Sequence, residues 1–419
     1  MTDVNVTKNY PYPAQFVWRF LSDFFTPWHP MMEWCEKVDS KTRRFGMPGE
    51  DGAYVERLTN FDPDERLFEY KMLEGIDGIN SYRGSAFVES LGDGESLVVW
   101  QAHIVAPSGI GERVAAGTAA VFKAGLDELE KIMATALTIK TEMIETDGEP
   151  TLAVDTAGAG ELMLFLHGIG GNRSNWHAQL NALSYQFQTA ALDFRGYGAS
   201  ELTAKSPELA EGSLNKVTVE DHINDISRVL AHFRAESVHL VGLSYGSWLA
   251  ACFAQTHPDK IKTLTLCAGS TGMSEASDEE RKRFEELRLK PMEAGQTPAD
   301  IAKGVVEVLS GPESTNESRQ QLFDSMVAIP QETYVAALRC FLNPPYKINF
   351  ETFDFPTLFI AGEHDKLASP AEMGGIAMRV PNAELAVISG AGHLINIEKP
   401  SAFSSQLSAW QHKLTAARS

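Results

Sequence analysis

Cysteine is scarce in this sequence, which has four in 419 residues and no Cys-x-x-Cys pair. Such a small number excludes a disulfide framework and leaves no zinc-binding pattern, because both need cysteines in close, repeated spacing. Cys252 and Cys267 lie in apolar runs, which is typical of small core residues. We therefore expect a protein that folds without disulfides or metal, in a reducing compartment.

Positive charge is also in short supply. The chain has 36 lysines and arginines against 56 aspartates and glutamates, a formal net charge of -20. Proteins that bind nucleic acid or an anionic membrane surface carry a basic patch. The one dense basic group, Lys41 with Arg43 and Arg44, lies beside acids and is typical of a solvated loop. Neither nucleic acid nor a membrane is expected as a partner.

Long apolar runs are absent as well. No uninterrupted stretch approaches the roughly 18 residues that are needed to span a bilayer. The first residues, MTDVNVTKNYPYPAQF, have neither the basic start nor the apolar segment of a signal peptide. We expect a cytoplasmic protein.

Residues 1–137 have the pattern of an α+β domain. Segments 54–61, 66–73, 82–90 and 96–105 alternate apolar and polar residues, and Asp-Gly, Gly-Asp or Asp-Pro turn signals separate them. Residues 117–134 place apolar side chains at helical spacing. The pattern predicts a curved antiparallel sheet followed by one long helix.

Residues 138–419 have a different pattern, in which apolar strands alternate with helices after a hairpin-like opening. This alternation predicts an α/β domain with a mostly parallel sheet and helices on both faces. Residues 272–340 contain several helical segments with no strand between them. They predict a helical cap over the carboxyl edge of the sheet, where open α/β folds bind ligands.

Ser244 is the candidate nucleophile. It lies between Gly242 and Gly246 in VHLVGLSYGSWLA, where a strand pattern changes into a helix pattern. Gly-x-Ser-x-Gly in this context forms a sharp turn that exposes the hydroxyl at a helix N-terminus, where a developing negative charge is stabilised. The alternative is a small-residue turn with a helix-capping serine.

A serine hydroxyl needs a base that takes its proton and an acid that orients the base. His393 follows the last predicted strand through a Gly-Ala-Gly loop, and Asp365 ends the preceding strand. The order Ser244, Asp365, His393 is the one expected for this architecture. Glu363 is an alternative acid, whereas Asp193 in DFRGYG is interpreted as part of a structural loop.

The negative charge that develops on the substrate oxygen needs hydrogen-bond donors. The loop His167-Gly168-Ile169-Gly170-Gly171 follows a strand and is flexible enough to direct its backbone amides inward. We expect the donors to be the backbone amides of Ile169 and Tyr245, the residue after the nucleophile. His167 itself is interpreted as a buried structural residue.

These motifs resemble those of the α/β-hydrolases: HGIGG, DFRGYG, GLSYGS, GEHD and GAGH occur in the family's order from about residue 140 to the end. AGEHDKLASP and GHLINIEKP are closest to the 3-oxoadipate enol-lactonase-like branch, whose members cleave lactones and esters. Ser247, where a glycine often follows the elbow, and the enlarged cap depart from that branch.

The first 135 residues resemble the SRPBCC superfamily, the polyketide cyclase or Bet v 1-like helix-grip fold, through stretches such as YPAQFVWRFLSDFFTPWHP and YRGSAFVE. The resemblance implies a curved sheet that grips the long helix around an apolar cavity. The side chains that would line this cavity are aromatic or histidine: Trp28, His29, Trp34, Tyr82, Trp100 and His103. The alternative is that these side chains form an ordinary core.

The leading hypothesis is therefore a serine hydrolase that cleaves a small-molecule ester or lactone without a cofactor. A C–C bond hydrolase of ring-cleavage products has the same triad and stays open, as does a non-catalytic small-molecule binding protein. The first domain is expected to assist the binding of an apolar or aromatic substrate. The sequence leaves a homo-oligomer open.

Overall fold

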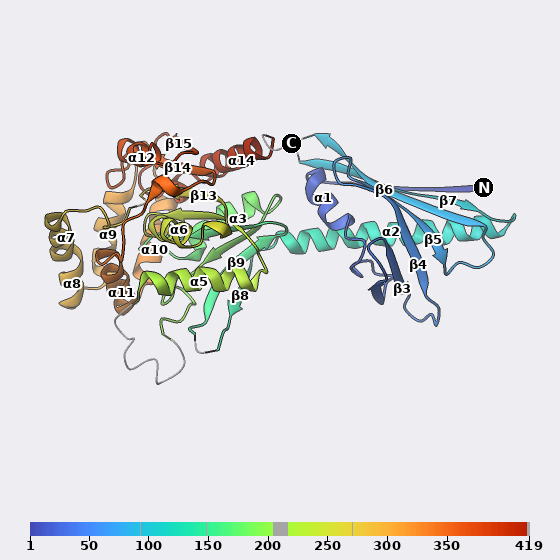
Figure 1. Cartoon of the computed structure of the whole chain (residues 1–419), viewed down its shortest axis with the longest axis horizontal. Helices are drawn as coiled ribbons and strands as arrows, with labels where there is room; N and C mark the ends of the chain where they lie inside the picture. Colours follow the sequence, from blue (N-terminus) through green and yellow to red (C-terminus); the bar gives the residue numbers. More distant parts are fainter. Residues whose placement is uncertain (93, 148, 204–216, 270, 417–419) are drawn as a thin grey trace. The chain divides into compact units, whose positions relative to one another are not determined.

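A computed structural model describes residues 1–92, 94–147, 149–203, 217–269 and 271–416 (Figure 1). The chain divides into two compact units, Met1–Thr138 and Ile139–Ser419. Each has its own sheet. The predicted layout, an antiparallel-sheet domain followed by an α/β domain, is confirmed. No helix in the described ranges is both long and apolar enough to cross a membrane.

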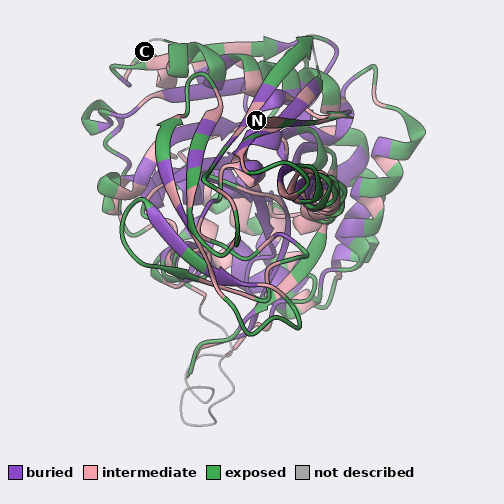
Figure 2. Ribbon diagram, turned by 90° about the vertical axis from the view of Figure 1, so that its right-hand side faces the viewer, coloured by how far each residue is buried: buried purple, intermediate pink, exposed green. Residues whose placement is uncertain are grey.

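The first unit is a seven-stranded antiparallel sheet with two helices. The sheet order is β1-β7-β6-β5-β4-β3-β2. Its strands are β1 (Thr2–Tyr10), β2 (Trp34–Lys37), β3 (Thr42–Gly46), β4 (Tyr54–Asp62), β5 (Leu67–Glu74), β6 (Ser81–Gly92) and β7 (Glu95–Val105), and its helices are α1 (Ala14–Leu21) and α2 (Ile110–Leu137). More buried and more exposed residues alternate along β1 and along much of β6. Purple and green bands follow one another along strands of this sheet in Figure 2. One face of the sheet is therefore available for α2, which contacts β1 and β7.

Aromatic side chains fill the space between α2 and the sheet. The ring of Trp100 stacks on Phe122 of α2 with centroids 4.6 Å apart. A Cβ atom added to Gly125 would lie 2.5 Å from the ring of buried His29. Tyr82 is also buried, whereas Trp28 and Trp34 are half-buried. These contacts are those of a packed core.

The expectation for His103 is wrong. Its neighbours Ala102 and Ile104 are buried in β7, so His103 points to the opposite face of the strand. There it is exposed and forms a 2.7 Å hydrogen bond with Asp3. The alternation along the strand places this histidine outside the core.

The second unit has an eight-stranded sheet of order β15-β14-β13-β12-β10-β11-β9-β8. The strands are β8 (Lys140–Ile144), β9 (Leu152–Gly158), β10 (Leu162–Leu166), β11 (Gln188–Leu192), β12 (Val238–Leu243), β13 (Ile261–Cys267), β14 (Thr357–Gly362) and β15 (Ala383–Ile388). Strands β8 and β9 form the predicted antiparallel opening, and β10 to β15 pair in parallel. The middle strands are buried along their whole length, as expected for a parallel sheet that has helices on both faces.

Two helix pairs pack beside this sheet, α3 (His177–Leu183) with α14 (Pro400–Ala416), and α5 (Val219–His232) with α6 (Tyr245–Thr256). The short segments η1 (Arg173–Trp176), η2 (Pro258–Lys260), η4 (Phe350–Thr352), α12 (Pro370–Ala377) and α13 (Ile395–Glu398) lie in the connections. Between β13 and β14 the chain forms α7 (Asp278–Phe284), the π-helical turn η3 (Glu285–Leu289), α8 (Lys290–Glu293), α9 (Pro298–Leu309), α10 (Asn316–Val327) and α11 (Gln331–Leu342). These helices gather at one end of the second unit (Figure 1) and form the cap.

Candidate active site

The turn that carries Ser244 is sterically demanding. Ser244 joins β12 to α6 with a φ of 55°, a left-handed conformation that is rare for a residue with a side chain. A Cβ atom on Gly242 would lie 2.3 Å from the carbonyl oxygen of Gly246, and one on Gly246 would lie 2.4 Å from that of Leu166. Only glycine fits at both flanks, and the turn presents the hydroxyl at the start of α6.

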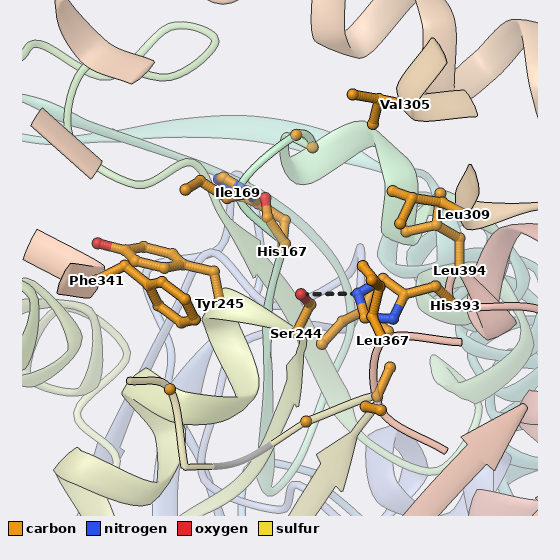
Figure 3. A pocket seen from close by; sticks show the side chains of 18 of the residues that line it. His167, Ile169, Ser244, Tyr245, Val305, Leu309, Phe341, Leu367, His393 and Leu394 are labelled. Atoms are coloured by element: carbon orange, nitrogen blue, oxygen red, sulfur yellow. Dashed lines mark hydrogen bonds between the residues drawn. The ribbon is translucent and has the colours of Figure 1, made fainter. Parts of the chain in front are cut away.

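Ser244, His393 and Asp365 form a continuous chain of hydrogen bonds. The Ser244 hydroxyl donates to Nε2 of His393 over 2.9 Å (Figure 3). Nδ1–H of His393 donates to Oδ2 of Asp365, also over 2.9 Å. This assignment places the imidazole proton on Nδ1 and leaves Nε2 free to accept from the hydroxyl. The structure thus brings together three residues that are separated by up to 149 positions in the chain.

Asp365 is held as an ionised carboxylate. Its other oxygen, Oδ1, accepts the backbone amides of Leu367 at 2.8 Å and Ala368 at 3.0 Å. Burial by itself raises the pKa of Asp365, but the hydrogen bond and charge of His393 and these amides outweigh burial, so the pKa lies below the usual aspartate value. A carboxylate in this state can stabilise a positive charge on His393.

The alternative acids lie elsewhere. Glu363 is exposed, and its carboxylate accepts from the Ser389 hydroxyl at 2.6 Å and the Gly390 amide at 3.0 Å. Asp193 is fully buried and accepts the backbone amide of Arg173 at 2.7 Å. Neither carboxylate is bonded to His393, so Asp365 is the acid that the geometry selects.

The loop after β10 lies beside Ser244 (Figure 3). A Cβ atom on Gly168 would be 3.5 Å from the Cβ of Ser244. Ile169 and Tyr245 both line the cavity, and their backbone amides donate to no acceptor in the part of the chain that the structure describes. The hydroxyl of Tyr197 donates to the carbonyl oxygen of Ile169 over 3.0 Å and so fixes the orientation of this loop.

His167 is a structural residue of the same loop. It is 1% exposed, Nδ1–H donates to the Gly168 carbonyl at 2.7 Å, and Nε2 accepts the Phe194 amide at 3.1 Å. Burial lowers the pKa of His167 to about 4, so the ring is neutral near pH 7. Both ring nitrogens are engaged, and His167 is not available as a second base.

A set of charged residues, of which the sequence pointed only to Asp193, anchors this loop to the neighbouring strands. Arg173 donates from Nε to Asp155 over 2.8 Å and also pairs with Asp193. Asp155 further accepts from His177 at 2.6 Å and from Thr141 at 2.6 Å. Burial raises the pKa of Asp155, yet these hydrogen bonds lower it to about 2. The only sequence signal for the set was the aspartate of DFRGYG.

A cavity of about 680 Å³ lies above Ser244 and His393. Cap residues form much of its wall, and most of them are apolar: Val305, Leu309, Leu322, Met326, Leu338 and Phe341. Figure 3 shows Val305 and Leu309 on one side of the cavity and Phe341 beside Tyr245. The size and lining suit a small organic molecule with limited polarity. No group of metal-ligating side chains gathers within the described ranges.

Residues 161–400 match the family model described as alpha/beta hydrolase fold. The chain therefore belongs to the α/β-hydrolase family, and this membership supports a hydrolase activity. Residues 1–134 match the model described as polyketide cyclase / dehydrase and lipid transport. Both resemblances that the sequence predicted are confirmed.

Several of the curated relatives are hydrolases, and others are acyltransferases. A 2-(acetamidomethylene)succinate hydrolase of Mesorhizobium japonicum is 28% identical over 60% of this chain and 88% of its own. A 2-hydroxy-6-oxononadienedioate/2-hydroxy-6-oxononatrienedioate hydrolase of Paraburkholderia xenovorans is 27% identical over 59% of this chain and 86% of its own. Both relatives are similar to well over half of this chain.

Two solved structures illustrate the likeness in fold. A thermophilic esterase from Thermogutta terrifontis has a TM-score of 0.57 and 25% identity, covering 65% of this chain and 98% of its own. The enol-lactonase from Burkholderia xenovorans LB400 has a TM-score of 0.51 and 22% identity, covering 63% of this chain and 97% of its own. At 22% identity, the similarity to the enol-lactonase structure shows a shared fold and nothing more specific.

Proposed function

We propose that this protein is a serine hydrolase that cleaves a small-molecule carboxylic ester or lactone through an acyl-enzyme. The observation that carries the proposal is the chain of two 2.9 Å hydrogen bonds that joins Ser244, His393 and Asp365. It provides a nucleophile, a base within reach of its proton, and an acid that orients the base, beneath an apolar cavity.

In the first half of the reaction, Ser244 Oγ attacks the carbonyl carbon and its proton passes to Nε2 of His393. The carbonyl oxygen becomes an oxyanion, which accepts the backbone amides of Ile169 and Tyr245. Asp365 stabilises the imidazolium. When the tetrahedral intermediate collapses, the bond to the alcohol oxygen breaks and that oxygen takes the proton from His393. In a lactone the same oxygen stays attached to the acyl chain.

In the second half, water attacks the acyl-enzyme and gives its proton to His393. The second tetrahedral intermediate uses the same two amides, and its collapse releases the carboxylic acid while His393 returns the proton to Ser244. Each step uses only groups of this chain and water.

Ser244→Ala tests the proposal against a panel of aryl esters and lactones. We expect kcat to fall by at least about 10⁴-fold, because the nucleophile is lost. A fluorophosphonate probe should label the unmodified protein at Ser244, as mass spectrometry of its peptides would show. Ser247→Ala is the matched control, since Ser247 lies in the first turn of α6, which follows Ser244, and its hydroxyl is fully buried and has no hydrogen-bond partner among the described residues. Undiminished turnover by Ser244→Ala, or an unlabelled Ser244, contradicts the proposal and favours a non-catalytic binding protein.

A second candidate within the enzyme class is C–C bond hydrolysis of a ring-cleavage product. The 27% identity to the P. xenovorans hydrolase favours it. Comparing kcat/KM for dienone acids with kcat/KM for simple esters separates the two. A preference for the dienone acids would assign C–C bond cleavage to the same triad.

The first unit is proposed to assist the binding of an apolar or aromatic substrate. Its match to a family model that includes lipid transport supports this role.

A further inference from the structure

Glu398 is a buried carboxylate that the proposed reaction does not use. It ends the short helix α13 and is only 7% exposed. A buried carboxylate costs free energy unless hydrogen bonds replace its water. Within the described ranges, Glu398 has no ion pair, and all its bonds come from backbone amides and one hydroxyl.

Two of these bonds hold the loop on either side of His393. Oε2 of Glu398 accepts the Gly392 amide and Oε1 accepts the Leu394 amide, each over 3.1 Å. The amide between them, that of His393, donates to the carbonyl oxygen of Leu309 over 2.8 Å. Three consecutive backbone amides are thus held, and Glu398 accepts two of them.

The same carboxylate also holds the cap. Its Oε2 accepts the Gly311 amide over 2.7 Å and the hydroxyl of Ser314, both in the turn between α9 and α10. A Cβ atom on Gly311 would lie 2.4 Å from the backbone nitrogen of Gly392, so the two backbones are in direct contact. Through Glu398 the α9–α10 turn and the His393 loop form one hydrogen-bonded unit.

We infer that Glu398 is a positioning residue, which fixes the loop that carries His393 and fastens it to the cap turn. The inference rests on the proposed function, in which Nε2 of His393 must lie within hydrogen-bond reach of Ser244. A shift of about 1 Å in a reacting group can cost on the order of 10²-fold in rate. Buried charge-assisted hydrogen bonds are strong enough to prevent such a shift.

Glu398→Gln tests the inference, because the amide keeps the size of the side chain but has one acceptor oxygen in place of two. Active sites are first counted by fluorophosphonate labelling, and kcat is expressed per labelled Ser244. We expect kcat per labelled site to fall about 10- to 100-fold with little change in KM, since His393 is displaced and the cavity is not. A merely structural glutamate would lower the melting temperature and the labelled fraction but leave kcat per labelled site unchanged.

Glu363→Gln is the matched control. Its carboxylate accepts from Ser389 and Gly390 in the neighbouring part of the same connection, but not from the amides that flank His393. We expect its kcat to equal that of the unmodified protein. Equal losses in both variants would show a general effect of charge near the loop and would overturn the inference.

Ser314→Ala keeps the inference testable if Glu398→Gln does not fold. It removes one hydrogen bond to Glu398 from the cap side, and we expect kcat to fall about twofold to tenfold. Its control is Ser389→Ala, which removes a hydroxyl from exposed Glu363. An unchanged kcat in Ser314→Ala, or in a folded Glu398→Gln, overturns the inference.

Failure of the inference can be told from failure of the proposed function. If the unmodified protein is not labelled at Ser244, the proposed function fails and the inference fails with it. If the unmodified protein is labelled but the variants keep its kcat, only the inference fails.

Discussion

Arg288 is a charged residue on a largely apolar cavity wall. It is half-buried and lies in the π-helical turn η3 of the cap, an irregularity that recurs at functional sites. The wall's other arginine, Arg379, is paired with Glu275 at 2.8 Å and Glu351 at 3.1 Å. The guanidinium of Arg288 forms no ion pair or hydrogen bond with any described residue. An uncompensated guanidinium in such a place favours a carboxylate on the substrate, which it can bind through two parallel hydrogen bonds.

Arg288→Gln should therefore distinguish substrates by charge. For an aryl ester with a free carboxylate, such as 4-nitrophenyl hydrogen succinate, we expect KM to rise about 10- to 100-fold, because a hydrogen bond to a charged group is worth about 1.5–3 kcal/mol. For 4-nitrophenyl butyrate, KM should stay the same. Arg283→Gln is the control, since Arg283 is an exposed cation of the adjacent helix α7 and does not line the cavity. An equal rise in KM for both esters would contradict the expectation.

Single residues differ in how far the sequence alone could place them. Ser244, Asp365 and His393 each follow a predicted strand beside glycine, so local pattern and strand order were enough to select them. Glu398 could not be selected, because its bond to Gly311 joins positions 87 residues apart. Tyr197 likewise acts through a bond to the loop 28 residues before it. Contacts of this kind become visible only when the chain is folded.

At the scale of elements, the position of the loop between β10 and α3 depends on ion pairs with the neighbouring strands. Its segment η1 begins with Arg173, which bonds Asp155 of β9 and Asp193 after β11. The loop is thus fastened to two neighbouring strands. Removing Asp155 should weaken both the fold and the placement of the Ile169 amide.

Asp155→Asn is expected to lower the free energy of unfolding at pH 7 by about 2 kcal/mol, the order of a lost charge-assisted hydrogen bond. The pKa of Asp155 is lowered from 3.8 to about 2 in the folded state, so its contribution is complete above pH 3.8 and is lost as the pH falls toward 2. Chemical denaturation between pH 7 and pH 2.5 measures this difference. The difference in free energy of unfolding between the unmodified protein and Asp155→Asn should be constant down to about pH 4 and become smaller at lower pH. A difference that grows toward low pH would contradict this account.

Elements were predicted best where their periodicity was strong. The helical pattern of residues 117–134 lies inside α2, which extends to Ile110 and Leu137. Its first two turns were missed because they are largely exposed or half-buried and carry little apolar periodicity. The exposed position of His103 follows from the same alternation that identified β7, and a strand's register decides which face a residue occupies.

At the scale of the whole molecule, each unit has its own core. All strand pairing is confined to one sheet or the other, and residues from Ile144 to Trp410 form the core cluster of the second unit. A separate core is the condition for independent folding. The fragment Ile139–Ser419 should therefore fold alone, with a single cooperative transition in calorimetry and stoichiometric fluorophosphonate labelling.

This fragment also tests the proposed role of the first unit. The residues proposed for the triad and for stabilising the oxyanion all belong to the second unit, so we expect kcat for 4-nitrophenyl acetate to stay within about twofold, because the proposed transition-state contacts are retained. For a bulky aromatic ester, KM should rise about fivefold or more if binding energy from the first unit is lost, since about 1 kcal/mol of binding corresponds to this factor. As a control, separately produced Met1–Thr138 is added to the fragment. This shows whether the first unit must be covalently linked to the second unit to lower KM. Identical KM values for both esters in the fragment and the full chain would contradict a role in binding and leave the second unit as a self-sufficient enzyme.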